Sequence, residues 1–540
     1  MEETIIVQTT LGPVKGIKKT SALGNDYYSF QSIPYAKPPV GDLRFRDPQP
    51  AQPWKEVLDG TKEGPCCPAK NNMLNVIHGE EDCLHINIFT KTFNPNKLVP
   101  VMIYVHGGAF MRGSSTIDMY GPDFLLQKDI ILFTFNYRLG AFGFLSIDDR
   151  SVEIPGNAGL KDQSMAIRWC KENAAFFGGN PKNITLFGES AGGCSVHYHM
   201  VSSQSRELFH RAIVMSGTVL NNWSIVPPRD WARRLAVSLG WDEKGTNKDM
   251  VEFLRSVDPI SIVKAQESLV NPQERRDKIL FPFGPVIEPY VGRGCFIPRE
   301  PLEMAREAWS NSLPILIGGV SDEGLFSYRE ANEYPDVVNT LKCENMVPLE
   351  LNLDQKGEEC QRLAEKLKKF YFGDKEPSVE RINEYVVLMT DKLFWHGIQR
   401  TLLSRLNAQE AGPTYLYRFN FDSPTFNHYR ILMCGKTVRG VCHADDLSYI
   451  FKNIIAKEVP DASTPEFKTI QIMVNLLVSF ATNSDPNCEA IEPTVWHPIN
   501  QQTTPFRCLN ISNNEVTMID LPETERMALW DSMYKKNQLY

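Results

Sequence analysis

The chain has 540 residues, of which 42% are hydrophobic and 23% charged, and these proportions are ordinary for a globular protein. Its formal net charge of −8 argues against a nucleic-acid-binding surface. No apolar run reaches about 18 residues, no linker tract divides the chain and no internal repeat is visible. We therefore expect one domain over 1–540, without a membrane span.

Strand-like and helix-like runs alternate through the first two thirds of the chain. The apolar patterns predict strands at 101–105, 131–138, 184–187, 210–216, 314–320 and 415–421, and helices at 158–177, 191–200 and 230–240. Such alternation predicts an α/β fold, with a mostly parallel central sheet and helices on both faces. Functional sites in these sheets lie beyond the carboxyl ends of the strands.

The first candidate site element follows the strand-like run VMIYV at 101–105. The chain continues as His106, Gly107, Gly108 and Ala109, a glycine-rich turn whose backbone N–H groups can bind a developing oxyanion. An alanine replaces the third glycine, which keeps the N–H donor but narrows the space beside it.

The second candidate element is Gly-Glu-Ser-Ala-Gly at 188–192, placed between a predicted strand and a predicted helix. A Gly-x-Ser-x-Gly turn in this position holds its serine on a strained bend above the sheet. Gly188 and Gly192 are needed because a side chain there would collide with the neighbouring strand or helix. The pattern predicts that Ser190 is a nucleophile.

A serine nucleophile needs a base, and the base needs an orienting acid. Asp322 and Glu323 both follow the strand predicted at 314–320, so either can serve as the acid. Four histidines come later in the chain, and local chemistry does not choose among them: His396, His428, His443 and His497.

The ordered motifs resemble the carboxylesterase/cholinesterase family along essentially the whole chain, and the insect α-esterases most closely. The resemblance rests on SIPYAKPPVGDLRF, EDCLHINIF, HGGAF, FNYRLGAFGFL, GNAGLKDQ, GESAGG, HRAIVMSGT, SDEGLF and VCHADDLSYIF. It implies an α/β-hydrolase fold and a serine carboxylesterase activity that requires no metal or cofactor. The insect α-esterases hydrolyse carboxylic esters and bind organophosphate and pyrethroid esters.

The resemblance also assigns roles to individual residues. It implies Ser190 as nucleophile, Glu323 as acid and His443 as base. It places the oxyanion hole at Gly108, Ala109 and Ala191. Positions that hydrogen-bond around the triad are Glu189 and Ser216, and pocket-lining positions are Tyr120, Trp223, Phe281 and Phe326. Structural ion pairs are implied for Arg44 with Glu81 and for Arg138 with Asp162.

Departures from the family narrow the expected substrates. Residues 68–82 contain no aromatic residue, whereas cholinesterases carry there a tryptophan that binds quaternary ammonium, so choline esters are poor candidates. Juvenile hormone esterases carry a glutamine where this chain has Glu189. We expect detoxification of xenobiotic or lipid esters and covalent inhibition by organophosphates. The alternatives are a hormone esterase or a protein that captures toxic esters stoichiometrically.

The twelve cysteines are scattered, and no C-x-x-C pair has zinc spacing. Among the disulfides of secreted relatives, only Cys66 or Cys67 with Cys83 can form here. Because most thiols would then be free, and the N-terminus does not read as a signal peptide, we expect a cytoplasmic protein. We expect a monomer or weak homodimer.

Overall fold

The computed structural model describes residues 3–71, 76–93, 97–277, 279–292, 294–456, 458–500 and 505–540. Within them, a 13-stranded sheet has the order β1-β2-β3-β7-β9-β8-β10-β11-β12-β13-β14-β15, with β4 beside β2, and β5 pairs with β6 separately. The strands are β1 Thr4–Gln8, β2 Pro13–Thr20, β3 Asp26–Pro34, β4 Leu58–Asp59, β5 Ala69–Asn71, β6 Val76–His78, β7 His85–Thr90, β8 Val99–Val105, β9 Ile131–Phe135, β10 Gly179–Glu189, β11 Arg211–Met215, β12 Ile315–Val320, β13 Thr414–Asn420, β14 Arg507–Ser512 and β15 Val516–Asp520.

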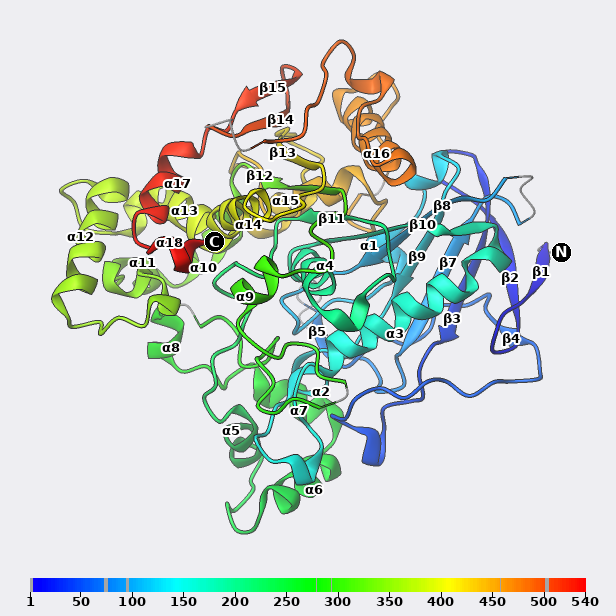
Figure 1. Ribbon diagram of the computed structural model, residues 1–540, viewed down its shortest axis with the longest axis horizontal. Coiled ribbons are helices and arrows are strands. Elements are labelled where there is room, and N and C mark those ends of the chain that lie inside the picture. The colour runs from blue at the N-terminus through cyan, green and yellow to red at the C-terminus, as the bar shows by residue number, and fades with distance from the viewer. Residues whose placement is uncertain are drawn as a thin grey trace.

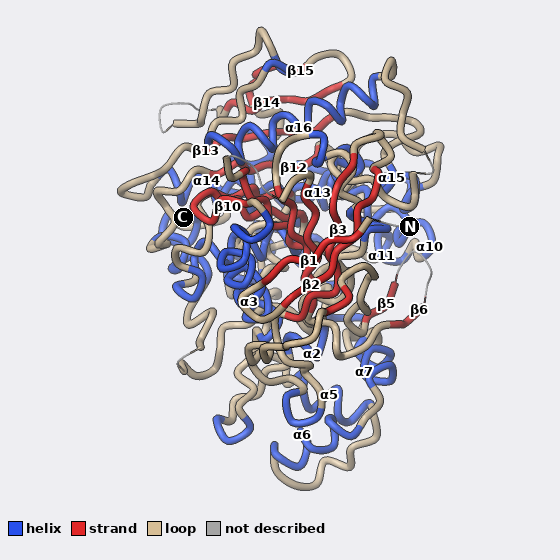
Figure 2. The backbone as a smooth tube through the Cα atoms, turned by 90° about the vertical axis from the view of Figure 1, so that its right-hand side faces the viewer, coloured by secondary structure: helices blue, strands red, loops and turns tan. Residues whose placement is uncertain are grey.

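The sheet is parallel from β9 through β8, β10, β11, β12 and β13 to β14, and antiparallel towards both edges. The α-helices are α1 Ile117–Tyr120, α2 Gly140–Phe144, α3 Ala158–Asn173, α4 Ala191–Val201, α5 Trp231–Ser238, α6 Asn247–Ser256, α7 Pro259–Gln266, α8 Pro272–Arg276, α9 Pro301–Arg306, α10 Tyr328–Glu333, α11 Asp336–Asn339, α12 Glu358–Phe372, α13 Ile382–Thr390, α14 His396–Leu406, α15 His428–Cys434, α16 Pro465–Asn483, α17 Thr524–Asp531 and α18 Lys536–Leu539. Helices flank the strands on both sides (Figures 1 and 2), which confirms the predicted α/β class.

Both faces of the central strands are buried, which explains their unbroken apolar sequences. On β8, Ile103 and Val105 join the hydrophobic cluster that includes residues of α3 and α4. The alternating residues Met102 and Tyr104 join the cluster on the other face, which includes residues of α16. The hydrophobic core therefore lies on both sides of the sheet.

The predicted elements are present with shifted ends. The strand predicted at 131–138 ends at Phe135, because the chain then turns inward and Arg138 pairs with Asp162 through bonds of 2.7 and 2.8 Å. The helix predicted at 158–177 is α-helical to Asn173 and continues as a 3₁₀ turn. The pair of Arg44 with Glu81 is also formed.

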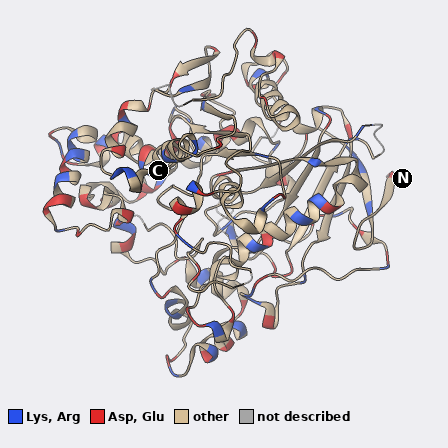
Figure 3. Ribbon diagram, viewed as in Figure 1, with Lys and Arg blue, Asp and Glu red and all other residues tan. Residues whose placement is uncertain are grey.

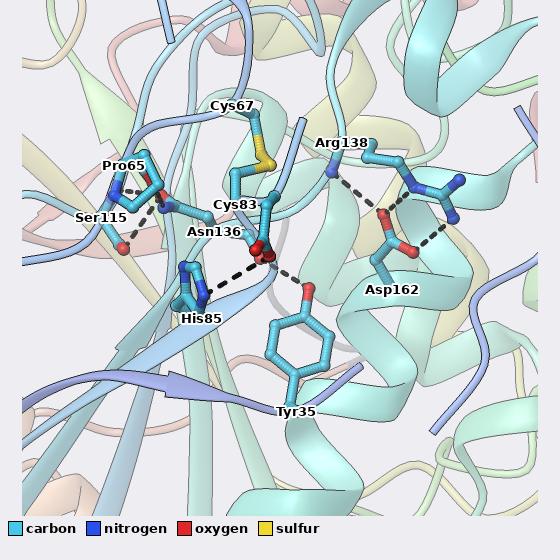
Figure 4. The surroundings of a disulfide bond; sticks show 10 residues. Tyr35, Pro65, Cys67, Cys83, His85, Ser115, Asn136, Arg138 and Asp162 are labelled. Atoms are coloured by element: carbon cyan, nitrogen blue, oxygen red, sulfur yellow. Dashed lines mark hydrogen bonds and ion pairs between the residues drawn. A yellow bond between two sulfur atoms is a disulfide. The ribbon is translucent and has the colours of Figure 1, made fainter. Parts of the chain in front are cut away.

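One disulfide joins Cys67 to Cys83, and the other ten cysteines are free. Figure 4 shows the surroundings of the disulfide, which include Tyr35, whose Oη donates a hydrogen bond to the Asn136 backbone carbonyl, and the ion pair of Arg138 with Asp162. The expectation that most thiols are free is therefore confirmed at ten positions, and the one pairing that the sequence allowed, Cys83 with Cys66 or Cys67, is formed. Of the two partners that the sequence allowed for Cys83, the structure selects Cys67.

Charged residues of both signs are interspersed over the outer helices and loops (Figure 3). Among the helices in the described ranges, none has the length and apolar character that crossing a bilayer requires. The described residues also contain no cluster of histidine, cysteine and carboxylate side chains that could hold a metal ion.

Candidate active site

The strand register brings several loops together at one edge of the sheet. Gly188 on β10 is paired with Val105 on β8, Glu189 with Met215 on β11, and Met215 with Gly318 on β12. Because these strands are parallel, their carboxyl ends lie side by side. The glycine-rich turn, the serine turn and the acidic turn therefore emerge next to one another.

Ser190 occupies the sharp turn between β10 and α4. Its φ of 60° and ψ of −124° are strained for a residue that carries a side chain. A Cβ on Gly188 would lie 2.6 Å from the backbone of Gly192, and a Cβ on Gly192 would lie 2.0 Å from Val105 O. The predicted need for glycine at both positions is therefore confirmed.

The turn after β8 presents backbone N–H groups beside Ser190. The approach is close, since a Cβ on Gly107 would lie 3.1 Å from Ser190 Cβ. Within the described part of the chain, the N–H groups of Gly108, Ala109 and Ala191 donate to no other backbone or side-chain acceptor. These three donors remain available for an oxygen atom in the space above Ser190.

The acidic turn after β12 places one carboxylate on a histidine. Glu323 Oε2 lies 2.6 Å from His443 Nδ1, and Glu323 Oε1 accepts a hydrogen bond from Val320 N at 3.0 Å. Asp322 turns away and accepts a hydrogen bond from Val441 N at 3.0 Å. Of the two acids that the sequence offered, Glu323 is the one in contact with His443.

The other three candidate histidines lie elsewhere. His396 is buried, with Nε2 3.1 Å from Asp531 Oδ1. His428 is buried beside Asn453, whose Nδ2 lies 3.2 Å from its Nδ1, and burial lowers its pKa to about 4. His497 is exposed. None of these three shares the cavity of Ser190.

His443 lies between two carboxylates, since its Nε2 is 3.1 Å from Glu189 Oε1. Burial alone would lower the pKa of His443, but Glu189 and Glu323 outweigh it and raise the pKa to about 9. Burial raises the pKa of Glu189 to about 8. The imidazole Nε2 of His443 therefore faces Glu189. Among the described residues, Ser190 Oγ makes no hydrogen bond.

The expectation that Glu189 and Ser216 hydrogen-bond around the triad is not met. Glu189 contacts His443 as an ion pair, without hydrogen-bond geometry. Ser216 Oγ is buried and has no hydrogen-bond partner among the described residues.

A cavity of about 770 Å³ opens above Ser190 and His443. Its wall is mainly apolar, and its charged lining residues carry both signs; Arg112 and Glu267 form an ion pair at 3.1 Å. The four aromatic residues selected from the sequence all line it, namely Tyr120, Trp223, Phe281 and Phe326. The arrangement can hold an apolar molecule against a serine hydroxyl, an imidazole and three N–H donors.

A sequence profile described as the Carboxylesterase family matches residues 3–530. The chain belongs to the carboxylesterase family. It is 45% identical over 544 residues to Esterase B1 of Culex pipiens, covering all of this chain and 99% of that protein. It is 34% identical to a juvenile hormone esterase of Tribolium castaneum, covering 89% of this chain and 84% of that one.

Solved structures support the same assignment. The juvenile hormone esterase of Manduca sexta, with OTFP covalently attached, superposes with a TM-score of 0.87 at 28% identity and covers 98% of this chain and 100% of its own. A PNB esterase superposes with a TM-score of 0.75 at 29% identity, covering 97% and 99%. This carboxylesterase has the α/β-hydrolase fold expected from its sequence and is a carboxylic ester hydrolase that acts on small esters.

Sequence reasoning missed two aromatic side chains that line the cavity of this carboxylesterase, Phe394 and Tyr429. The ring of Phe394 lies 4.4 Å from that of His443, centroid to centroid, and it lines the cavity. In the sequence, Phe394 and Trp395 read only as part of a helical run. No local signal marks a contact between side chains 49 positions apart.

Proposed function

We propose that this protein is a serine carboxylesterase that uses Ser190, His443 and Glu323 in a two-step acyl-enzyme mechanism. The observation that carries the proposal is the juxtaposition of a strained serine, an imidazole held at 2.6 Å by a buried carboxylate, and backbone N–H groups that donate to no acceptor among the described residues. These are the groups that acyl transfer requires.

In the first step Ser190 Oγ bonds to the ester carbonyl carbon while His443 Nε2 accepts the hydroxyl proton. The carbonyl oxygen becomes an oxyanion and binds the N–H groups of Gly108, Ala109 and Ala191. The alcohol then leaves with the proton from His443. Water repeats the sequence on the acyl-enzyme and releases the acid, while Glu323 holds the imidazole and stabilises its positive charge.

We propose neutral, apolar esters as the substrates, with detoxification of xenobiotic or lipid esters as the role and organophosphate or pyrethroid esters among the ligands. The mainly apolar wall and the mixed charges of the cavity favour neutral molecules. Lys70 lines the cavity in the segment where a choline site would be sought, and its positive charge disfavours quaternary ammonium.

Substitution of the three proposed catalytic residues tests the mechanism. Ser190→Ala, Glu323→Gln and His443→Gln should each lower kcat on p-nitrophenyl esters, by about 10⁴-fold or more for the serine and histidine. Two matched controls, Asp322→Asn and His428→Gln, remove neighbouring candidates and should remain active. Folding is checked by thermal melting. Full activity of a folded Ser190→Ala variant would refute the proposal.

A further inference from the structure

A π-helical turn, Asp391–Trp395, lies between α13 and α14. The N–H of His396 bonds to the carbonyl of Asp391, five residues back, where an α-helix would bond four back. The turn is fixed at one end by Trp395, whose indole N–H donates to Val320 O at 2.9 Å, at the end of β12. Such turns are rare and frequently occur at functional sites.

Carbonyl groups of this turn hold the loop that follows β11. Leu393 O accepts hydrogen bonds from Asn221 Nδ2 at 2.7 Å and from Trp223 Nε1 at 2.6 Å, and Phe394 O accepts one from Asn221 Nδ2 at 3.0 Å. A Cβ on Gly397 would lie 2.4 Å from Asn221 Nδ2, so the two segments are in close contact. The turn thereby fixes Trp223, one wall of the cavity.

The same turn places an aromatic ring on the imidazole. Phe394 lies 4.4 Å from His443 at an interplanar angle of 36°. Phe326 stands at 6.0 Å from His443 and at 5.8 Å from Phe394, nearly perpendicular to the latter. Glu323 contacts the imidazole at Nδ1 and Glu189 lies at Nε2, so both carboxylates act at the edge of the ring, whereas Phe394 lies against its face.

We propose that Phe394 is a positioning residue for His443. Its ring blocks rotation of the imidazole out of the plane in which Nδ1 bonds Glu323 and Nε2 lies 3.1 Å from Oε1 of Glu189, the residue before Ser190. The π-helical turn sets this placement and the Trp223 wall together. The inference rests on the proposed function, because the imidazole plane matters only if His443 exchanges a proton with Ser190.

A rival reading makes Phe394 only a wall of the cavity, and the two readings differ in what they predict. A wall changes the discrimination between acyl groups of different size, since it contacts the substrate. A positioning residue changes the rate of proton transfer for every substrate, because misplacing a catalytic group lowers kcat whichever acyl group is bound.

The test compares Phe394→Leu, which removes the ring, with Phe394→Tyr, which keeps it. We measure kcat and KM for p-nitrophenyl acetate, butyrate and hexanoate. Phe394→Leu should lower kcat roughly tenfold for all three esters and leave KM within about twofold. Phe394→Tyr should restore kcat to within about twofold of the wild-type value. Thermal melting confirms that both variants are folded.

Trp223→Leu is the matched control, because Trp223 bonds to the same turn and lines the cavity without stacking on His443. It should change the ratio of kcat/KM between acetate and hexanoate. The proposal is overturned if Phe394→Leu retains the wild-type kcat, or if it changes only that ratio. If Phe394→Leu does not fold, Phe394→Met is judged by the same criteria.

Ser190→Ala, assayed in parallel, separates the two hypotheses. Near-wild-type esterase activity in a folded Ser190→Ala variant would refute the proposed function itself. An inactive Ser190→Ala together with a fully active Phe394→Leu would refute only the positioning role.

Discussion

The two carboxylates around His443 determine how the site responds to pH. Glu189 and Glu323 raise the pKa of the imidazole to about 9 against the effect of burial. His443 must be neutral to accept the Ser190 proton, so kcat/KM should rise with pH along a limb above the ordinary histidine value of about 6.5.

Glu189→Gln tests this account. Removing a carboxylate that raises the pKa of His443 should lower that pKa, so the acid limb of kcat/KM should move to lower pH. The measurement is a pH profile from 5 to 10 on a neutral ester. Asp322→Asn serves as a control because Asp322 does not contact His443, and its profile should match the wild type. If the acid limb of kcat/KM stays in place or moves to higher pH in Glu189→Gln, then Glu189 does not raise the pKa of His443.

Ala109 carries a backbone cost that glycine would not. Its φ is 58°, in the left-handed region that costs a side-chain-bearing residue roughly 1–2 kcal/mol. Ala109→Gly removes this strain and keeps the N–H donor, so activity should be retained and the melting temperature unchanged or higher. The gain in kcat/KM should be largest for bulkier esters.

The comparison variant is Ala109→Val, since a β-branched residue tolerates positive φ poorly. It should lose both activity and stability. If Ala109→Gly loses activity severely instead, the methyl group itself orders the turn. The turn has other supports, because Tyr137 Oη donates to His106 O at 2.9 Å and Gly140 N donates to Phe110 O at 2.8 Å.

The sequence identifies residues whose chemistry is visible in a local pattern. The bend at Ser190 follows from Gly188 and Gly192, which no other residue could replace without collision. The placement of the Ser216 hydroxyl, which has no hydrogen-bond partner in the part of the chain that the structure describes, and that of the Phe394 ring follow instead from packing between distant segments. Neither leaves a trace in the neighbouring sequence.

At the scale of elements, strands were predictable because β8, β10 and β11 each contain a fully buried apolar run, at 101–105, 184–187 and 212–215. Strand ends were less predictable, as at Phe135, where an ion pair of Arg138 draws the chain away. The π-helical turn Asp391–Trp395 was unpredictable, since its residues are ordinary helix formers and the turn is held by partners from the 221–223 loop.

The segment closed by Cys67 and Cys83 forms part of the cavity wall through Ala69, Lys70 and His78. Reduction should destabilise the protein, because a closed loop of this length is worth about 3 kcal/mol in the chain-entropy model. The measurement is the melting temperature with and without reductant under denaturing pre-incubation, since both sulfurs are buried.

A double variant, Cys67→Ser with Cys83→Ser, should melt at the temperature of the reduced protein and lose sensitivity to reductant. Cys66→Ser is the matched control: Cys66 is the adjacent free thiol, so this variant should behave as the wild type. Identical melting temperatures for oxidised and reduced wild type would show that the bond contributes nothing. The sequence could not choose between Cys66 and Cys67, because neighbouring positions differ only in side-chain direction.

At the scale of the whole molecule, the site is assembled from segments spread over more than 300 residues. The turn after β8, the turn after β10, the acidic turn after β12 and the loop carrying His443 meet because the parallel register aligns their strands. The order of these segments along the chain was readable from sequence. The cavity that they enclose was not predictable from the sequence, because residues of α8, the β5–β6 segment and α15 also line it.

Organophosphate esters should inactivate the enzyme with close to one equivalent per Ser190. Ser190 Oγ would bond to phosphorus, its proton would pass to His443 and the leaving group would depart, while the N–H groups of the glycine-rich turn receive the phosphoryl oxygen. Release then requires water to approach opposite the Ser190 oxygen. His443 acts beside that oxygen, and Ala109 on the turn carries no base. Planar acyl-enzymes lack this in-line requirement, so carboxylic esters turn over.

Titration of the released leaving group against the concentration of active sites tests this prediction. We expect one equivalent to be released, followed by arrest. Release of many equivalents within minutes would reveal a base in the cavity that this geometry does not provide.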